Sequence, residues 1–339
     1  MKNKNLTICD ATIQPGETAN LALPLPDYNS CISLYMPIKV VHGKEAGPCV
    51  IIFSGMEGNE FNGIEIINRL LKTIDAHSFN GSLIAVPIMN IMGLIKPGSL
   101  SYEKDFDNSF PGNNEGSFAE RIAHVFTQQF LSKADYLIEL KTGGLNDDIL
   151  PQIYCDITNN ITKTLAKKFA APVVSHISHN NSLCNTAEEL DIPLLIYKAG
   201  EAMRFDEAAI RTGISGIRNI FQELGIITSD EPEAPSIKPA FSKEQDWSRA
   251  QRSGILVTSV HLGDYIKEND VIGRINDPFN DAIFEVVKAS RDGIVVGINR
   301  SPLIIEGQNI FKIASFIDNN LVELNLEQWS ELQEKANEQ

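Results

Sequence analysis

Apolar residues in the first two thirds of the chain alternate between strand-like and helix-like spacing. Residues 49–54 form a short apolar run, CVIIFS, which is bounded by glycine or proline and predicts a strand buried on both faces. Residues 64–74 follow with apolar positions at helical spacing. The alternation continues through predicted strands at 82–89, 136–140 and 193–197 and predicted helices at 117–131, 159–169 and 206–224. It indicates an α/β domain whose sheet is covered by helices on both faces.

The spacing changes near residue 229. Residues 229–243 hold three prolines and no periodicity, which predicts a linker. Glycines then punctuate short apolar runs over residues 244–317, which predicts a small all-β module. We therefore expect an α/β domain over residues 1–228, opening with a short β segment, and then the linker and the β module. An acidic amphipathic helix is expected over residues 318–339.

The charge and the cysteines narrow the classes of partner. The 339 residues include 29 Lys and Arg against 44 Asp and Glu, a formal net charge of −15. Nucleic-acid phosphates and anionic lipids repel such an excess of negative charge, so neither nucleic acid nor membrane is expected as a partner. The five cysteines are scattered without C-x-x-C spacing, and no apolar run resembles a signal peptide or a membrane span. We expect a cytoplasmic protein with reduced thiols.

Charged and polar residues gather just after the predicted strands. In open α/β sheets, ligands bind beyond the carboxyl ends of the strands, so side chains at these positions are candidates for a functional site. Each of the four strand ends is also rich in glycine, which lets the backbone turn tightly there. The candidates at the strand ends are Glu57, Glu60, Asn90, Lys141, Thr142 and Lys198.

Motifs spread over nearly the whole chain resemble those of one known family. The segments are 13–17 (IQPGE), 117–124 (SFAERIAH), 262–264 (LGD) and 277–279 (DPF). They are similar to motifs of the succinylglutamate desuccinylase/aspartoacylase family, a branch of the zinc carboxypeptidase fold. The resemblance implies a mixed sheet flanked by helices, followed by a lipoyl-like β barrel or sandwich. It also implies hydrolysis of the amide bond of N-acyl amino acids by a zinc-bound water.

The zinc ligands implied by the resemblance are largely replaced in this chain. Glu57 stands where the family has its first histidine ligand, Glu60 matches the family's glutamate, and Lys141 stands at the second histidine. A protonated lysine carries three donors and no lone pair, so it cannot bind a cation. Two carboxylates alone make a poor zinc site. We therefore expect no zinc cofactor at this position, although zinc is the cofactor of the family.

The positions that the family uses for catalysis and substrate binding are also altered. Lys198 stands at the position of the general-base glutamate. Asp107 and Asn108 replace an Asn-Arg pair that binds substrate in the family, so the bidentate clamp on a carboxylate is lost. Together with Asn90 and Thr142, they are the residues expected to line the remaining pocket.

Two buried glutamates without a dication would be costly unless other cations paired with them. We therefore expect Lys141 and Lys198 to form an ionic cluster with Glu57 and Glu60 where the family binds zinc.

The substitutions leave two functions open. The first is a non-catalytic pseudoenzyme that binds a small ligand or a partner protein through the altered site, with a homo-oligomer as a further option. The alternative is an active hydrolase that cleaves the amide bond of an N-acyl amino acid, either metal-free or with rebuilt metal ligands. His176 and His179 lie three residues apart and could contribute to rebuilt ligands, but two histidines without a third ligand are more often surface residues.

Overall fold

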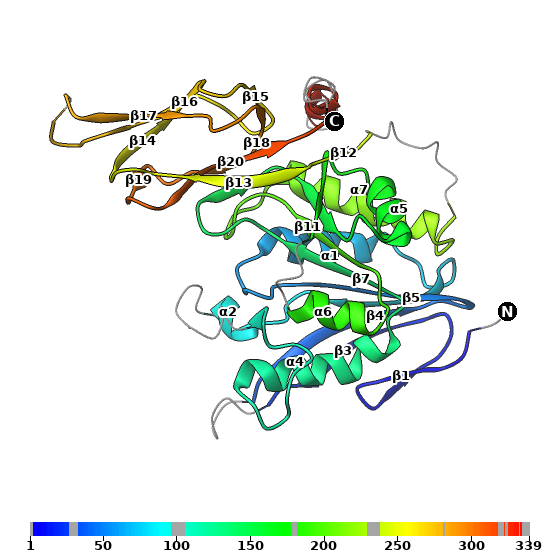
Figure 1. Ribbon diagram of the computed structural model, residues 1–339. Coiled ribbons are helices and arrows are strands. Elements are labelled where there is room, and N and C mark those ends of the chain that lie inside the picture. Colours follow the sequence, from blue (N-terminus) through cyan, green and yellow to red (C-terminus); the bar gives the residue numbers. More distant parts are fainter. Residues whose placement is uncertain are drawn as a thin grey trace.

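A nine-stranded mixed sheet forms the centre of the first two thirds of the chain (Figure 1). The computed structural model describes residues 3–26, 33–95, 106–177, 182–228, 238–280, 282–317, 322, 325–331 and 333. In order across the sheet, the strands are β12 (Ala240–Phe241), β10 (Val173–His176), β9 (Gln152–Cys155), β11 (Leu194–Lys198), β7 (Tyr136–Lys141), β5 (Glu45–Ser54), β6 (Asn80–Val86), β4 (Tyr35–His42) and β3 (Glu17–Pro24). The central strands β11, β7, β5 and β6 are parallel, so their carboxyl ends lie at one edge. Strands β9 and β4 run antiparallel to β11 and β6.

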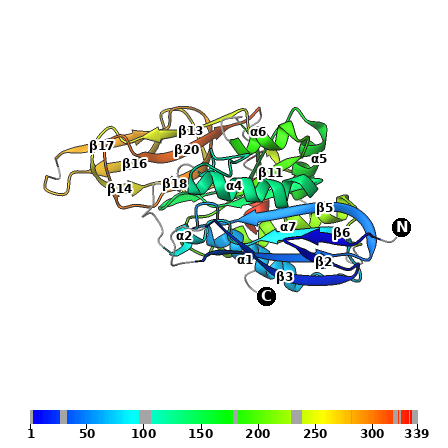
Figure 2. The same cartoon turned by 90° about the horizontal axis from the view of Figure 1, so that it is seen from below.

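Helices cover both faces of this sheet and bury two separate apolar cores (Figures 1 and 2). Helices α1 (Phe61–Lys72), α5 (Asn160–Phe169) and α7 (Glu207–Glu223) pack on one face, and α4 (Phe118–Gln129) and α6 (Ser182–Glu189) pack on the other. The remaining short elements before α4 and after it are β1 (Leu6–Ile8), β2 (Ala11–Ile13), α2 (Ile91–Ile95) and the 3-10 turn η1 (Leu131–Lys133). The predicted α/β fold with a mixed sheet is confirmed. Across the described ranges, no helix has both the length and the apolar character needed to cross a lipid bilayer.

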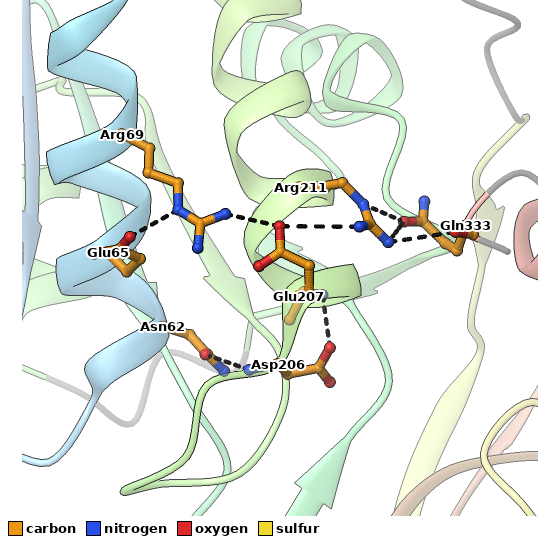
Figure 3. A network of polar contacts seen from close by, with 8 residues as sticks. Asn62, Glu65, Arg69, Asp206, Glu207, Arg211 and Gln333 are labelled. Atoms are coloured by element: carbon orange, nitrogen blue, oxygen red, sulfur yellow. Dashed lines mark hydrogen bonds and ion pairs between the residues drawn. The ribbon is translucent and has the colours of Figure 1, made fainter. Parts of the chain in front are cut away.

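Polar side chains tie α1, α7 and the C-terminal residues together (Figure 3). Arg69 of α1 donates a hydrogen bond of 2.7 Å to Glu207 at the start of α7. The same carboxylate lies 3.9 Å from Arg211, whose guanidinium donates to the side-chain oxygen of Gln333 at 3.4 Å. Residues 325–331 are helical, within the expected C-terminal helix. These contacts hold Gln333 against α7.

The described residues between 244 and 317 contain strands as their only regular structure. One sheet has the order β13-β20-β18-β15 and the other β17-β16-β14-β19, and an apolar core fills the space between them. The strands are β13 (Glu244–Arg249), β14 (Gly254–Thr258), β15 (Tyr265–Ile266), β16 (Val271–Asn276), β17 (Phe284–Lys288), β18 (Gly293–Asn299), β19 (Leu303–Ile304) and β20 (Asn309–Ser315). We refer to residues 244–317 as the β region; its likeness to a lipoyl-type module stays a prediction.

The expected linker is described only in part. Residues 229–237 lie outside the described residues, and Ala240–Phe241 forms strand β12, which pairs with β10 at the edge of the main sheet. The second half of the expected linker therefore belongs partly to the α/β sheet.

The β region is joined to the α/β sheet through the segment that follows β7. Strand β8 (Asp147–Ile149) follows β7 along the chain and pairs antiparallel with β18 of the β region. Asn299 donates to Asp147 at 3.0 Å, and Arg300 donates two hydrogen bonds to Asp148 at 2.8 and 3.0 Å. A shared apolar core adds residues of both parts, with Leu150 packed near Val296. These contacts fix the segment after β7 against the β region.

Candidate functional site

The structure brings the predicted strand-end residues to one edge of the sheet. Glu57 and Glu60 lie in the loop between β5 and α1, and Asn90 follows β6. Lys141 is the last residue of β7, and Lys198 is the last residue of β11. The two lysines are partners in the parallel register of these strands, so their side chains are neighbours on one face of the sheet.

Glu60 is buried in a tight loop that packs on helix α2. Its Oε2 accepts hydrogen bonds from the backbone N–H of Met56 at 2.8 Å and of Glu57 at 3.4 Å. Gly58 has a left-handed φ of 81°, and a Cβ there would lie 2.2 Å from the carbonyl carbon of Gly93, so only glycine fits. The other carboxylate oxygen, Oε1, has no hydrogen-bond partner among the described residues. Burial raises the pKa of Glu60 to about 8.

Lys141 is paired with two other carboxylates. Its Nζ donates to Oδ2 of Asp107 at 2.8 Å and to Oδ1 at 3.0 Å, and it lies 3.3 Å from Oε1 of Glu139. Glu139 is fully buried, and burial raises its pKa to about 7. Burial also opposes the charge of Lys141, but the attraction of Glu139 and Asp107 outweighs it and holds the lysine pKa above its usual value. Lys141 is therefore an ammonium ion at neutral pH.

These ion pairs differ from the expected cluster. No ion pair within 4 Å joins Lys141 to Glu57 or Glu60 in the described residues, although the charge of Glu60 still attracts the lysine over a longer distance. Two causes account for the difference. Glu139 lies two residues before Lys141 and so points to the same face of β7, and the loop that carries Asp107 reaches that face as well.

Glu139 is a site residue that the sequence analysis did not single out. The sequence pattern that could have identified it is a carboxylate inside the apolar run of β7, two positions before Lys141. A charged residue in a strand that is buried on both faces requires a partner, and the next charge on the same face is Lys141.

Lys198 has no such partner. Its side chain makes no hydrogen bond and no ion pair within 4 Å to any part of the chain that the structure describes. Its charge acts at longer range on Glu139 and on Asp147. At the general-base position that the resemblance implies, the structure thus has a half-buried lysine without an acceptor among the described residues.

The other predicted residues fall into two groups. Asn90 donates to the carbonyl of Met56 at 3.2 Å and accepts from the N–H of Gly93 at 2.9 Å, so it holds the loop of Glu60 in place. Thr142 is buried beside Lys141, whereas the side chain of Asn108 is exposed. That Asn90, Asp107, Asn108 and Thr142 line a ligand pocket stays a prediction.

The donor chemistry of the site does not fit zinc. Glu57, Glu60 and Lys141 occupy the three ligand positions that the resemblance implies, and the ammonium of Lys141 has no lone pair to offer. Among the described residues, no group of three or more His, Cys, Asp or Glu side chains is placed to hold a metal ion. His176 lies on the surface, 3.8 Å from Asp156, and His179 lies outside the described residues.

Comparisons with known proteins agree with the fold and with the resemblance. The profile of the succinylglutamate desuccinylase/aspartoacylase catalytic domain matches residues 46–224. The N-alpha-acetyl-L-2,4-diaminobutyric acid deacetylase of Halomonas elongata is 26% identical over 313 residues, which cover 88% of this chain and 91% of that protein.

Two solved structures have a similar fold at low sequence identity. The product-bound ectoine utilization protein EutE (DoeB) of Ruegeria pomeroyi has a TM-score of 0.79 at 21% identity, covering 92% of this chain and 98% of that chain. A succinylglutamate desuccinylase/aspartoacylase of Rhodobacter sphaeroides has a TM-score of 0.78 at 21% identity, covering 89% of this chain and 96% of that chain. Because the matched catalytic domain spans more than half of the 339 residues, this chain belongs to the succinylglutamate desuccinylase/aspartoacylase family.

Proposed function

We propose that this protein is a family member without zinc-dependent deacylase activity, and that it binds a small ligand of the N-acyl amino acid class at the altered site. The observation that carries the proposal is the charged Lys141, which stands at a ligand position and bonds both oxygens of Asp107 at 2.8 and 3.0 Å. The ligand class follows the name of the relative from Halomonas elongata, a deacetylase of an N-acetylated diamino acid.

Electrostatics supports the exclusion of zinc. Two unit charges of the same sign 4 Å apart repel by about 4 kcal/mol at an effective dielectric constant near 20, and a dication doubles that figure. A zinc ion beside Lys141 would also have to compete with the ammonium for Asp107 and Glu139. Lys198, when protonated, cannot accept a proton from a water molecule as the family's glutamate does.

A metal-free hydrolase is the second candidate, and the buried carboxyl groups favour it. Burial raises the pKa of Glu139 to about 7 and that of Glu60 to about 8, which is the range that suits a general base at neutral pH. Such an enzyme would use one of these carboxylates to remove a proton from the attacking water.

The first test is the metal content of the purified, untagged protein, measured by elemental analysis before and after dialysis against zinc. We expect less than about one tenth of an equivalent of tightly bound zinc, because the donor set lacks a third ligand. Zinc near one equivalent that survives dialysis contradicts the proposal. Release of amino acid from N-acetyl amino acids by metal-free protein would instead favour the second candidate.

A variant in the opposite direction tests whether the three substituted residues alone account for the proposed loss of zinc binding. The triple variant Glu57→His, Lys141→His, Lys198→Glu restores the family's residue types at the three altered positions. We expect it to bind about one equivalent of zinc, with Lys198→Glu alone as the matched control that binds none. Failure of the folded triple variant to bind zinc would mean that the geometry of the site, and not only its chemistry, has changed.

A further inference from the structure

A second polar cluster lies where strands β9 and β11 meet strand β20 of the β region. Lys198 of β11 and Gln152 of β9 are direct partners in the antiparallel register, so their side chains lie side by side on the same face. Lys312 of β20 reaches the same face from the β region, since its Nζ donates to the hydroxyl of Tyr154 at 2.9 Å. We call Gln152, Lys198 and Lys312 the donor cluster.

The hydrogen bonds that connect the donor cluster all run in one direction. An ammonium group can only donate, so Lys312 makes Tyr154 an acceptor, and the Tyr154 hydroxyl in turn donates to Oε1 of Gln245 at 3.1 Å. The amide nitrogen of Gln245 then donates to Oε1 of Gln152 at 3.2 Å. This series of hydrogen bonds therefore ends at Gln152, whose Nε2 is a fully buried donor with no partner among the described residues. A buried donor without an acceptor is costly.

The two lysines add further unused donors. Lys198 has no hydrogen-bond acceptor in the described parts of the chain, and Lys312 uses one of its three N–H groups. Burial, together with the charge of Lys198, lowers the pKa of Lys312 to about 8, so the two like charges act on each other. Asp246, which is paired with Arg291, and Asp147, which is already bonded to Asn299, offset this repulsion only over a longer distance. Among the described residues, no carboxylate accepts a hydrogen bond from the donor cluster.

We propose that Lys198, Lys312 and Nε2 of Gln152 bind a carboxylate group of the ligand. A carboxylate supplies one negative charge and about four lone-pair positions, which match the unused donors of three neighbouring side chains. A dianion such as phosphate fits less well, because Glu139 and Asp147 lie within electrostatic range of Lys198 and repel the second charge. The inference rests on the ligand-binding part of the proposed function and names the ligand group that the site recognises.

The test follows the two lysines by NMR in protein labelled with ¹³C at the lysine ε-carbon. Sodium acetate, N-acetyl-L-alanine, its neutral amide and inorganic phosphate are titrated separately at constant ionic strength. The signals are assigned with the variants Lys198→Met and Lys312→Met. We expect saturable shifts of both signals with the two carboxylates and none with the amide.

The variants separate this site from general charge effects. Lys198→Met or Lys312→Met should each weaken binding of N-acetyl-L-alanine at least about tenfold, because each removes a charged hydrogen bond. The matched control Lys267→Met removes an exposed lysine of the β region and should leave binding unchanged.

Three results would overturn the carboxylate site: no saturable shift with either carboxylate, equal binding of the amide, or tighter binding of phosphate. The zinc content of the same sample is measured in parallel. Tightly bound zinc would contradict the proposed function, whereas an absent carboxylate response contradicts only this site.

Discussion

The charge of Lys141 balances two carboxylates that would otherwise face each other without a cation. Its side chain is 11% exposed, and Glu139 beside it is fully buried. Removing one member of a buried ion pair leaves an uncompensated charge, which costs about 3–5 kcal/mol. We expect Lys141→Met to lower the free energy of unfolding by about 3 kcal/mol at pH 8, measured by urea denaturation. Lys267→Met, at an exposed site, is the matched control and should change it by less than about 0.5 kcal/mol.

The loss of unfolding free energy in Lys141→Met should depend on pH, and the direction of this dependence follows from the raised pKa of Glu139. Burial already raises the pKa of this carboxyl from 4.5 to about 7, and without the lysine its pKa rises further. A carboxyl with a raised folded-state pKa binds a proton on folding between its unfolded and folded pKa values, so stability falls as pH rises through that range. The variant should therefore be much closer to the wild type at pH 5 than at pH 8. An equal loss at both pH values would show that Glu139 is not the uncompensated group.

At the residue scale, the sequence predicts which strand-end side chains lie close together but not which ion pairs they form. The strand ends and the family resemblance predict that Lys141 and Lys198 lie close together, and the structure makes them register partners on adjacent parallel strands. The side chain of Lys141 is a flexible four-carbon stem, so its position in the sequence does not determine which carboxylate it pairs with. Its partner Asp107 lies in a loop whose path no local sequence pattern specifies. Gln152 and Lys312 stayed unnoticed because strands distant in sequence bring them together.

Among the elements, the short segment after β7 leaves no room for a side chain at Gly143. A Cβ on Gly143 would lie 1.7 Å from the backbone oxygen of Asp147, whereas a Cβ on the adjacent Gly144 would meet only the side chain of Asp147, at 3.2 Å. A backbone clash cannot be relieved by a rotamer change. We expect Gly143→Ala to lower the free energy of unfolding by about 3 kcal/mol, measured by thermal or urea denaturation.

Gly144→Ala is the matched control for this substitution, since the two glycines are neighbours on the same turn. It should cost less than about 1 kcal/mol. Equal effects of the two substitutions would mean that the segment tolerates a side chain at Gly143 by moving, and that the path from β7 to β8 is not held as the contacts with β18 indicate.

The elements that the sequence predicted well are the long ones with clear spacing. The run at residues 49–54 lies in β5, and the helical spacing at 206–224 corresponds to α7. Strand β9 has four residues and runs antiparallel to β11, and neither its length nor its direction leaves a pattern in the local sequence. Its pairing is decided by tertiary contacts, including the hydrogen bond between Gln152 and Gln245 of the β region.

For the whole molecule, the contacts between its two parts predict a single unfolding transition. Strand β8 pairs with β18 of the β region, and Leu150 is buried in an apolar core that both parts share. Leu150 also donates its backbone N–H to the carbonyl of Val296 at 3.0 Å. Truncating such a buried leucine costs about 3 kcal/mol, and both parts should lose that stability together.

Two spectroscopic signals can follow the two parts of the molecule separately. Of the two tryptophans, Trp247 lies in β13 of the β region, so its fluorescence, measured in a Trp329→Phe background, follows that part. Far-UV circular dichroism follows the helices, most of which precede residue 229 in the described structure.

In urea, the two signals of the wild type should coincide, and in Leu150→Ala both should shift to the same lower midpoint. The matched control Leu303→Ala truncates an exposed leucine of β19 and should shift neither. A tryptophan transition at lower urea than the dichroism transition would mean that the β region unfolds independently. A carboxylate site shared between β11 and β20 would then open before the α/β domain loses its structure.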